Sequence, residues 1–238
     1  HVAGMAGAVG NNGIGIAGAA WDVKLMHIKV FQSTGVGNST TIAEGVEYAS
    51  ENGATIINMS FGSYAESSTL KLALENAYAT AILVAAAGNN SVFLGPCQSD
   101  PPCNPFFPAA YSYVLGVQDW PPPPPYSLTG YTNFDPDGPI STTYANLLNY
   151  EIIAPGTGII STIPNGGYGT LTGTSMATPL VAGALALYNE QKPDDSNELI
   201  FGSIINNAYP ELSPSTGSPF VDILAAISSE PVPKLAVL

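Results

Sequence analysis

The segment LTGTSMATPLVAGALAL, residues 171–187, predicts a buried helix that begins at a tight turn. Gly173 allows the chain to turn sharply, and Thr174 is a competent N-cap for the helix that follows. No charged residue occurs from Leu180 to Tyr188, and a helix that is apolar on all sides belongs inside a sizeable domain. The segment therefore predicts a central helix with a hydroxyl group at its start.

That hydroxyl belongs to Ser175, which lies among the free backbone N–H groups of the first helical turn. The helix dipole is positive there, so a negatively charged oxygen is favoured. Pro179 has no N–H to bond the carbonyl of Ser175, which keeps this turn distinct from the rest of the helix. The alternative is an ordinary core helix whose serine merely helps the cap, and the segment alone supports both interpretations.

Composition limits the class of protein. The chain has 238 residues, with 5 basic and 18 acidic side chains and a formal net charge of −13. So few basic residues argue against nucleic acid or an anionic membrane as a partner. The sequence also contains no apolar run long enough to span a membrane. We expect one soluble domain that acts as a monomer.

The cysteines, Cys97 and Cys103, are separated by five residues. A small disulfide-closed loop is favoured over two free thiols, since no histidine lies nearby to suggest a metal site. The pair thus points to an oxidising compartment and a secreted protein. The chain begins without a methionine, so its true N-terminus is expected to lie further upstream.

The first half alternates between predicted strands and helices. Strands are expected at residues 21–31, 54–60 and 81–86, and helices at 41–52 and 67–80. This order predicts parallel βαβ units with helices on both faces of the sheet. Functional residues gather at the carboxyl ends of such strands. The residues at these ends are Ser60, Gly62, Gly88 and Asn89.

The second half is less regular. Short strands are expected at residues 111–117, 151–156 and 158–162, and helices at 196–207 and 221–227. The proline-rich segments 96–108 and 121–125 predict irregular surface structure. No repeat or internal linker is evident, so we expect one domain over residues 1–229, followed by the start of a linker at 230–238.

Several motifs together resemble the subtilases, the subtilisin-like serine proteases. The serine block GTSMATP at residues 173–179 resembles the family's serine motif. Further blocks follow the family's order: HVAG at 1–4, NMSFG at 58–62, AAGN at 86–89, APG at 154–156 and ST at 161–162. The resemblance implies an α/β, three-layer subtilisin-like fold, with a mainly parallel sheet flanked by helices and without its N-terminal elements. It also implies a serine endopeptidase.

The resemblance assigns roles to individual residues. Ser175 is implied as the nucleophile, and Asn89 as the side-chain donor of the oxyanion hole together with the N–H of Ser175. Donors fixed in advance stabilise charge that develops only as the tetrahedral intermediate forms. Taken alone, Asn89 could equally be a turn residue after Gly88.

Substrate binding is implied for two extended segments and one pocket. The segments are expected to bind an extended polypeptide through main-chain hydrogen bonds. The small pocket walls are expected to leave room for a large apolar or aromatic side chain. The segments are Gly35, Val36, Gly37 and Ser60, Phe61, Gly62, and the pocket walls are Ala86, Ala87 and Gly88.

The loop at residues 10–16 resembles the calcium loop of the family. Its implied ligands are the amide oxygen of Asn12 and the carbonyls of Gly10, Ile14 and Ile16. Oxygen ligation suits a hard cation. The family's site also takes ligands from nearer the N-terminus, so calcium is a possible structural cofactor.

The match fails at the catalytic base. In the family, the base is the first histidine of a His-Gly-Thr-His-Val-Ala-Gly block, whereas this chain opens at the second, His1. His27 is expected to be a packed side chain within a strand, and Leu180 stands where many relatives carry histidine. Two hypotheses follow: part of a subtilase that is active when complete, or a non-catalytic subtilase-like domain that binds peptides.

Overall fold

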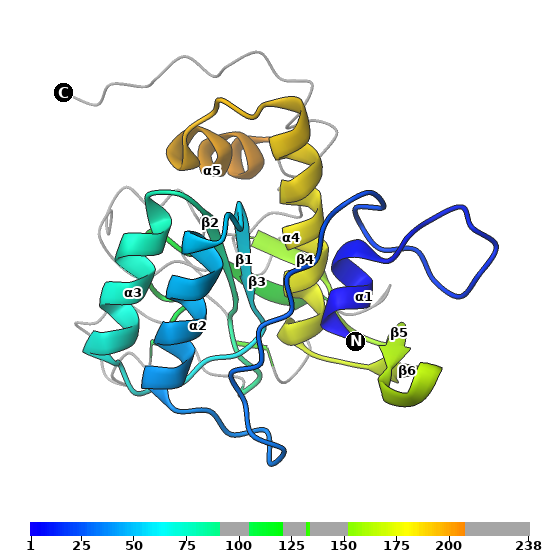
Figure 1. Ribbon diagram of the computed structural model, residues 1–238, viewed down its shortest axis with the longest axis horizontal. Coiled ribbons are helices and arrows are strands. Elements are labelled where there is room, and N and C mark those ends of the chain that lie inside the picture. The colour runs from blue at the N-terminus through cyan, green and yellow to red at the C-terminus, as the bar shows by residue number, and fades with distance from the viewer. Residues whose placement is uncertain (91–104, 121–131, 134–151, 208–238) are drawn as a thin grey trace.

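A four-stranded parallel sheet forms the centre of the molecule (Figure 1). The computed structural model describes residues 1–90, 105–120, 132–133 and 152–207. The strands lie in the order β1-β2-β3-β4. Their bounds are Ile56–Met59 for β1, Ile82–Ala86 for β2, Leu115–Trp120 for β3 and Ile152–Pro155 for β4. All residues of β2 and β3 are buried, as expected of a sheet covered on both faces.

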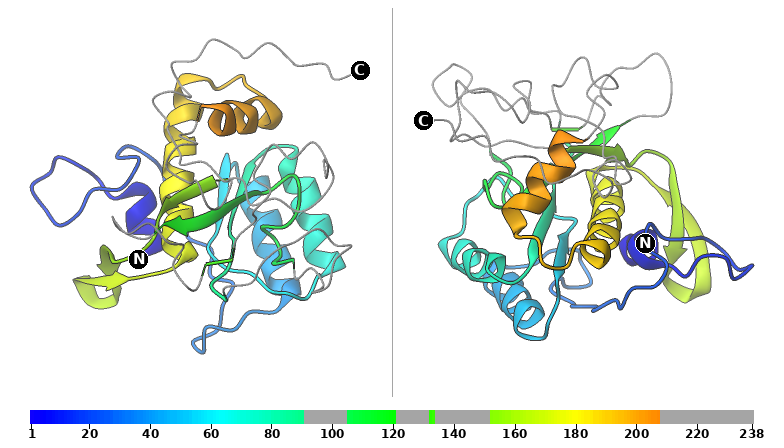
Figure 2. Two further views of the ribbon diagram at one scale, coloured as in Figure 1. Left: turned by 180° about the vertical axis from the view of Figure 1, so that it is seen from behind. Right: turned by 90° about the horizontal axis from the view of Figure 1, so that it is seen from above.

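Alternating side chains of the sheet face two separate helical layers. Leu83 and Ala85 of β2 pack in one core with α2 (Ser39–Glu51) and α3 (Ser68–Tyr78). Their neighbours Ile82 and Val84 pack in the other core, with the long helix α4 and with α5. Helix α4 spans Thr174–Gln191, and α5 spans Asn197–Asn206. Figure 2 shows the helices on either side of the sheet, which confirms the three-layer α/β fold.

Helix starts follow the capping residues in the sequence. Asn38, Ser67 and Ser196 each accept a hydrogen bond from the backbone N–H three residues later, at the starts of α2, α3 and α5. Each side chain satisfies one N–H that has no partner within its helix. Among the described residues, no helix is both long enough and apolar enough to cross a membrane.

The strand expected at residues 21–31 is wrong. In the structure, this segment belongs to no strand. Its side chains dock instead on two helices: Val23 and Leu25 lie against Gly7 of α1 (Val2–Gly7), while Ile28 and Val30 lie against Gly45 of α2. The valine, isoleucine and aromatic content of the segment favoured a strand, but among the described residues no backbone ladder forms with it.

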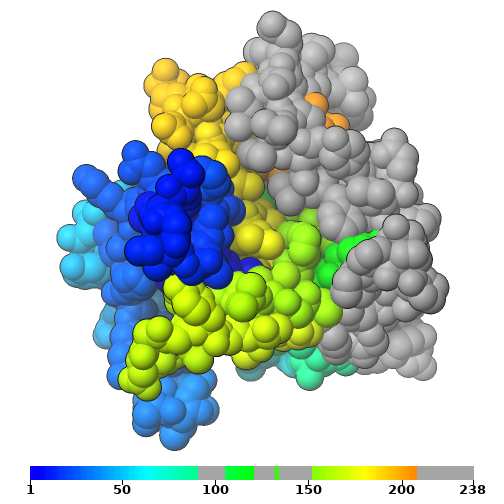
Figure 3. Space-filling model, turned by 90° about the vertical axis from the view of Figure 1, so that its right-hand side faces the viewer, coloured from blue at the N-terminus to red at the C-terminus, as the bar shows by residue number. Residues whose placement is uncertain are grey.

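A hairpin precedes α4. Strands β5 (Ile159–Ile163) and β6 (Gly167–Leu171) pair antiparallel around the short 3-10 turn η1 (Pro164–Gly166). The sequence predicted β5 but missed β6, whose two glycines lower its apparent strand propensity. The hairpin lies beside the N-terminal segment on the face shown in Figure 3, where Tyr168 covers Gly15.

Other expectations differ from the structure in their bounds or lie outside the described residues. The strand expected at 111–117 begins later, because Tyr111 and Val114 donate to the carbonyls three residues before them and form turns. The helix expected at 221–227, the proline run at 121–125 and the linker at 230–238 lie outside the described residues. Cys97 and Cys103 lie outside them too, so their disulfide stays a prediction.

Candidate active site

The start of α4 lies where strands of the central sheet end. Ser175 Oγ donates a hydrogen bond of 2.9 Å to the carbonyl of Ser60, which follows β1. The N–H of Gly173 donates to the carbonyl of Gly156, which follows β4, at 3.0 Å. The carboxyl ends of parallel strands thereby hold the first turn of the helix in place. We refer to this junction, formed by Gly173, Thr174 and Ser175 with Ser60, Asn89 and Gly156, as the serine corner.

The cap of α4 differs from the sequence prediction. Gly173, not Thr174, is the N-cap, with φ of 145° in a region that favours glycine. Asn89 of the segment after β2 takes the place of a side-chain cap. Its Oδ1 accepts hydrogen bonds from the N–H of Thr174 at 2.9 Å and from Thr174 Oγ1 at 3.1 Å. The same hydroxyl accepts from the N–H of Gly88 at 3.2 Å, which ties β2 to α4.

These contacts fix the orientation of the Asn89 amide. A backbone N–H can only donate, so the atom that accepts from Thr174 must be the amide oxygen. Nδ2 is then the free end of the group, and no described residue accepts a hydrogen bond from it. The side chain of Asn89 is exposed. A donor with a fixed direction therefore faces solvent beside Ser175.

Ser175 occupies the second position of the helix and is half-buried. Its backbone N–H lies in the first turn, where no carbonyl of the helix can accept it. Thr178 Oγ1 donates to the carbonyl of Thr174 at 2.7 Å, and Pro179 follows without an N–H. The first turn thus presents two groups of Ser175, its side-chain hydroxyl and its backbone N–H.

Neither histidine of the chain contacts Ser175. His1 Nε2 lies 3.1 Å from the carbonyls of both Ile159 and Gly169, so it acts as a donor that bridges the two strands of the hairpin. This agrees with the expectation that His1 is not the base. His27 was expected to be packed, which is wrong: its side chain is exposed. The exposure follows from the missing ladder at residues 21–31.

A family model described as the subtilase family matches residues 1–223. The chain belongs to the subtilase family. Alkaline elastase YaB of Bacillus sp. (strain YaB) is 38% identical over 208 residues, which cover 87% of this chain and 49% of that relative. Subtilisin Savinase of Lederbergia lenta is 36% identical over 208 residues, covering 87% of this chain and 68% of that relative. The chain spans about half the length of Alkaline elastase YaB.

Solved subtilase structures share the fold. Sphericase superposes with a TM-score of 0.74 at 34% identity, covering 87% of this chain and 68% of that chain. A protease from Pseudoalteromonas arctica gives a TM-score of 0.78 at 29% identity, covering 96% of this chain and 69% of that chain. These likenesses confirm the subtilisin-like fold.

The two segments implied in substrate binding flank a pair of aromatic rings. The rings of Phe31 and Phe61 meet edge to face, with centroids 5.1 Å apart, and Phe31 also lies against Gly37. Val36 is 63% exposed, and Gly62 is exposed too. Neither segment belongs to a strand. The aromatic contact links the segment at 35–37 to the one at 60–62.

Asn133 is a supporting residue that the sequence did not reveal. It is fully buried, and its Nδ2 donates to the carbonyl of Ala87 at 2.8 Å. Its N–H donates to the carbonyl of Gly88 at 2.9 Å, and its Oδ1 accepts from the N–H of Asn90 at 3.1 Å. Asn133 thus supports the backbone of the implied pocket wall through these hydrogen bonds. No local motif around it could have identified this role.

Asp119 is a second residue that was missed. This carboxylate at the end of β3 is fully buried and accepts a hydrogen bond of 2.8 Å from Thr157 Oγ1. It packs under Gly156, where a side chain would collide with Asp119 and with the carbonyl of Gly173. Asp119 therefore supports the junction between β4 and α4. The apolar run around it gave no sign of a function.

The loop implied in calcium binding does not form a complete site. The Oδ1 of Asn12 accepts from the N–H of Ile14 at 2.9 Å, which closes a local turn. With the carbonyls of Gly10, Ile14 and Ile16, it offers four neutral oxygens, whereas calcium takes six to eight. Among the described residues, no cluster of acidic, histidine or cysteine side chains could hold a metal ion. The residues present therefore do not fit calcium on their own.

Proposed function

We propose that the chain supplies the nucleophile and the oxyanion hole of a subtilisin-like serine endopeptidase. The observation that carries the proposal is the orientation of Asn89, whose Oδ1 is held by Thr174 so that Nδ2 stays free. The N–H of Ser175 is the second donor. Two donors that are fixed before reaction stabilise an oxyanion more than a planar carbonyl, which lowers the barrier to acyl transfer.

Each residue then has a defined part in the reaction. Ser175 Oγ attacks the carbonyl carbon of the substrate while its proton passes to a base, and the oxyanion accepts from Asn89 Nδ2 and the N–H of Ser175. The C–N bond breaks as the leaving amine takes the proton. Water then hydrolyses the acyl ester and releases Ser175. Neither histidine contacts Ser175, so the proposal requires a base other than His1 or His27.

The substrate side of the proposal concerns an extended polypeptide. Residues 35–37 and 60–62 would bind its backbone, and the small side chains of Ala86 and Ala87 would border a pocket for a large apolar residue. The pocket wall is rigid because Asn133 holds the carbonyls of Ala87 and Gly88. A peptide with phenylalanine beside the reacting group is accordingly the preferred probe.

A peptide boronic acid tests this proposal without a catalytic base. Boron bound to a serine oxygen becomes tetrahedral and mimics the oxyanion, which ¹¹B NMR detects. We expect a tetrahedral signal with the chain and none with Ser175→Ala. A peptide-binding domain without a nucleophile would instead give the same signal and affinity in both proteins. That result would contradict the proposal.

The remaining parts of the proposal concern the protein as a whole. We place it outside the cell, on the basis of its acidic composition and the disulfide expected between Cys97 and Cys103. We also expect a monomer with one domain over residues 1–229, since the sequence shows no repeat or internal linker. Sedimentation velocity of the chain should give one species of about 24.5 kDa. Calcium binding needs ligands beyond residues 10–16, so titration calorimetry of the chain with calcium should show no tight site.

A further inference from the structure

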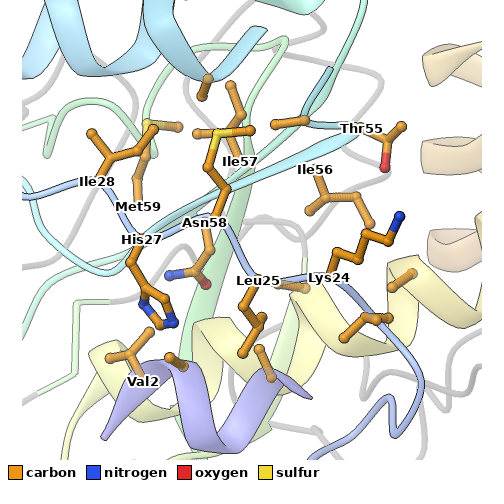
Figure 4. A pocket seen from close by; sticks show the side chains of 18 of the residues that line it. Val2, Lys24, Leu25, His27, Ile28, Thr55, Ile56, Ile57, Asn58 and Met59 are labelled. Atoms are coloured by element: carbon orange, nitrogen blue, oxygen red, sulfur yellow. The ribbon is translucent and has the colours of Figure 1, made fainter. Parts of the chain in front are cut away.

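The space around the serine corner is unevenly filled. A cavity of about 970 Å³ borders β1, where Asn58 lines it (Figure 4). This cavity extends as far as Phe61, but residues 86–88, the walls of the proposed substrate pocket, do not border it. All three of these wall residues are buried. Another part of the chain therefore covers the walls that a substrate side chain would contact.

The covering group is the ring of Phe106, which lies between the two sides of the proposed substrate site. A Cβ built on Gly88 would lie 3.0 Å from Cδ1 of this ring, and one built on Gly62 would collide with its Cε1. Both positions are glycines, so the ring packs directly against the backbone on each side. The ring thus fills space between residues 60–62 and residues 86–88.

This space lies next to the proposed reacting groups. Ser175 Oγ donates a hydrogen bond to the carbonyl of Ser60, two residues before Gly62. Asn89, the proposed oxyanion donor, directly follows Gly88. The two glycines that contact the ring are therefore close in the chain to the two residues that would face the reacting carbonyl. A substrate side chain beside that carbonyl is directed toward the space that the ring fills.

The backbone at Phe106 is held in place, so rotation of the side chain is the way to empty this space. The N–H groups of Ser63 and Phe107 each donate to the carbonyl of the other residue at 2.8 Å. The carbonyl of Phe106 accepts from the N–H of Ala110 at 3.0 Å. The ring meets that of Tyr64 edge to face, with centroids 5.0 Å apart, and is only half-buried. It can therefore turn toward solvent without crossing the core.

We propose that Phe106 is a specificity-determining residue, whose ring closes the substrate pocket and turns outward before a large apolar side chain enters. This inference rests on the proposed function, because it concerns the residue beside the bond that Ser175 attacks. A side chain as small as that of alanine binds without moving the ring. A phenylalanine side chain needs the same space, so its binding loses the free energy that holds the ring against Gly62 and Gly88. The pocket for a large residue thus opens only in a second rotamer of Phe106.

Two peptide boronic acids that differ only in the side chain beside boron test this role. Phe106→Ala should strengthen binding of the phenylalanine boronate about 10- to 100-fold, the effect of no longer displacing an apolar ring. It should leave the affinity for the alanine boronate unchanged. Phe201→Ala in α5 is the matched control, because its ring is also partly buried but packs near Tyr78, and it should alter neither affinity. Titrations followed by ¹¹B NMR measure all four changes.

A fluorine label tests the movement in a chain that keeps its ring. With 4-fluorophenylalanine at position 106, the ¹⁹F NMR signal should move when the phenylalanine boronate binds and stay in place when the alanine boronate binds. If Phe106→Ala does not fold, the labelled chain alone decides.

Three outcomes would overturn the proposal. One is an equal gain in affinity for both boronates in Phe106→Ala, which would give the ring a structural role only. Another is a ¹⁹F signal that the phenylalanine boronate leaves in place. The third is the absence of a tetrahedral boron signal with either peptide in the native chain, which would contradict the proposed function and this inference with it.

Discussion

The serine corner and the outer edge of β1 are neighbours in the fold, but their polar groups are paired differently. In the serine corner, Ser175 Oγ donates to the carbonyl of Ser60, and Asn89 Oδ1 accepts from the N–H of Thr174. At the outer edge of β1, the Oδ1 of Asn58 has no partner among the described residues, within which β1 pairs with β2 alone. The residues that we propose as nucleophile and oxyanion donor are therefore held by contacts within the described chain, whereas the outer edge of β1 is not.

The largest expected contrast is in stability. Leu185 of α4 is fully buried, so Leu185→Ala should lower the free energy of unfolding by about 2–5 kcal/mol. Leu25→Ala, in the segment 23–30 beside β1, removes a side chain that is 42% exposed and should cost less than about 1 kcal/mol. Urea denaturation of both variants measures the contrast. Similar losses would mean that the segment beside β1 is as well packed as the core.

The next contrast concerns backbone strain. Gly173 has φ of 145°, and a Cβ there would lie 3.2 Å from the Asn89 amide, so Gly173→Ala should cost about 1–3 kcal/mol. It should also weaken the peptide boronate, since Asn89 must move. Gly53→Ala, after α2 and outside the proposed substrate-binding segments, is the matched control, because its φ is 82° and no atom lies within 4 Å of the added methyl group. We expect it to lower stability by about 1 kcal/mol with no effect on the boronate.

A smaller effect is expected from the oxyanion donor itself. Asn89→Ala removes one hydrogen bond to a charged oxygen and should weaken the peptide boronate about 10- to 100-fold. The neighbouring Asn90→Ala keeps its backbone bond to Asn133 and should change the affinity little. Inhibitor titrations monitored by ¹¹B NMR compare the two. An equal loss in both variants would assign Asn89 a structural role only.

Much of the fold could be predicted because local sequence patterns determine its strands and helices. The apolar strand expected at 81–86 and the helices expected at 67–80 and 196–207 are confirmed as β2, α3 and α5. The strand expected at residues 21–31 failed for a different reason. Its residue composition favours a strand, but a ladder also needs a neighbouring strand, and within the described residues none pairs with it.

For the candidate active site, too, the sequence predicted only what is visible in local patterns. Ser175 and Asn89 stand out because their motifs are contiguous, and the structure brings them together through Thr174. Asn133 and Asp119 act through buried contacts with segments far away in the sequence, so no pattern around them reports their roles. Thr174 was predicted as the N-cap instead of Gly173, because the side chain that accepts from the first turn, Asn89, comes from another element.

The most direct test of the central claim is the rate at which a fluorophosphonate labels Ser175 with and without added imidazole. We expect slow labelling of the chain alone, a rate that rises with the concentration of neutral imidazole, and no labelling of Ser175→Ala. Imidazole would then act as the base for a site whose nucleophile and donors are already in place. Rapid stoichiometric labelling without imidazole would contradict this assignment, and so would a rate that imidazole leaves unchanged.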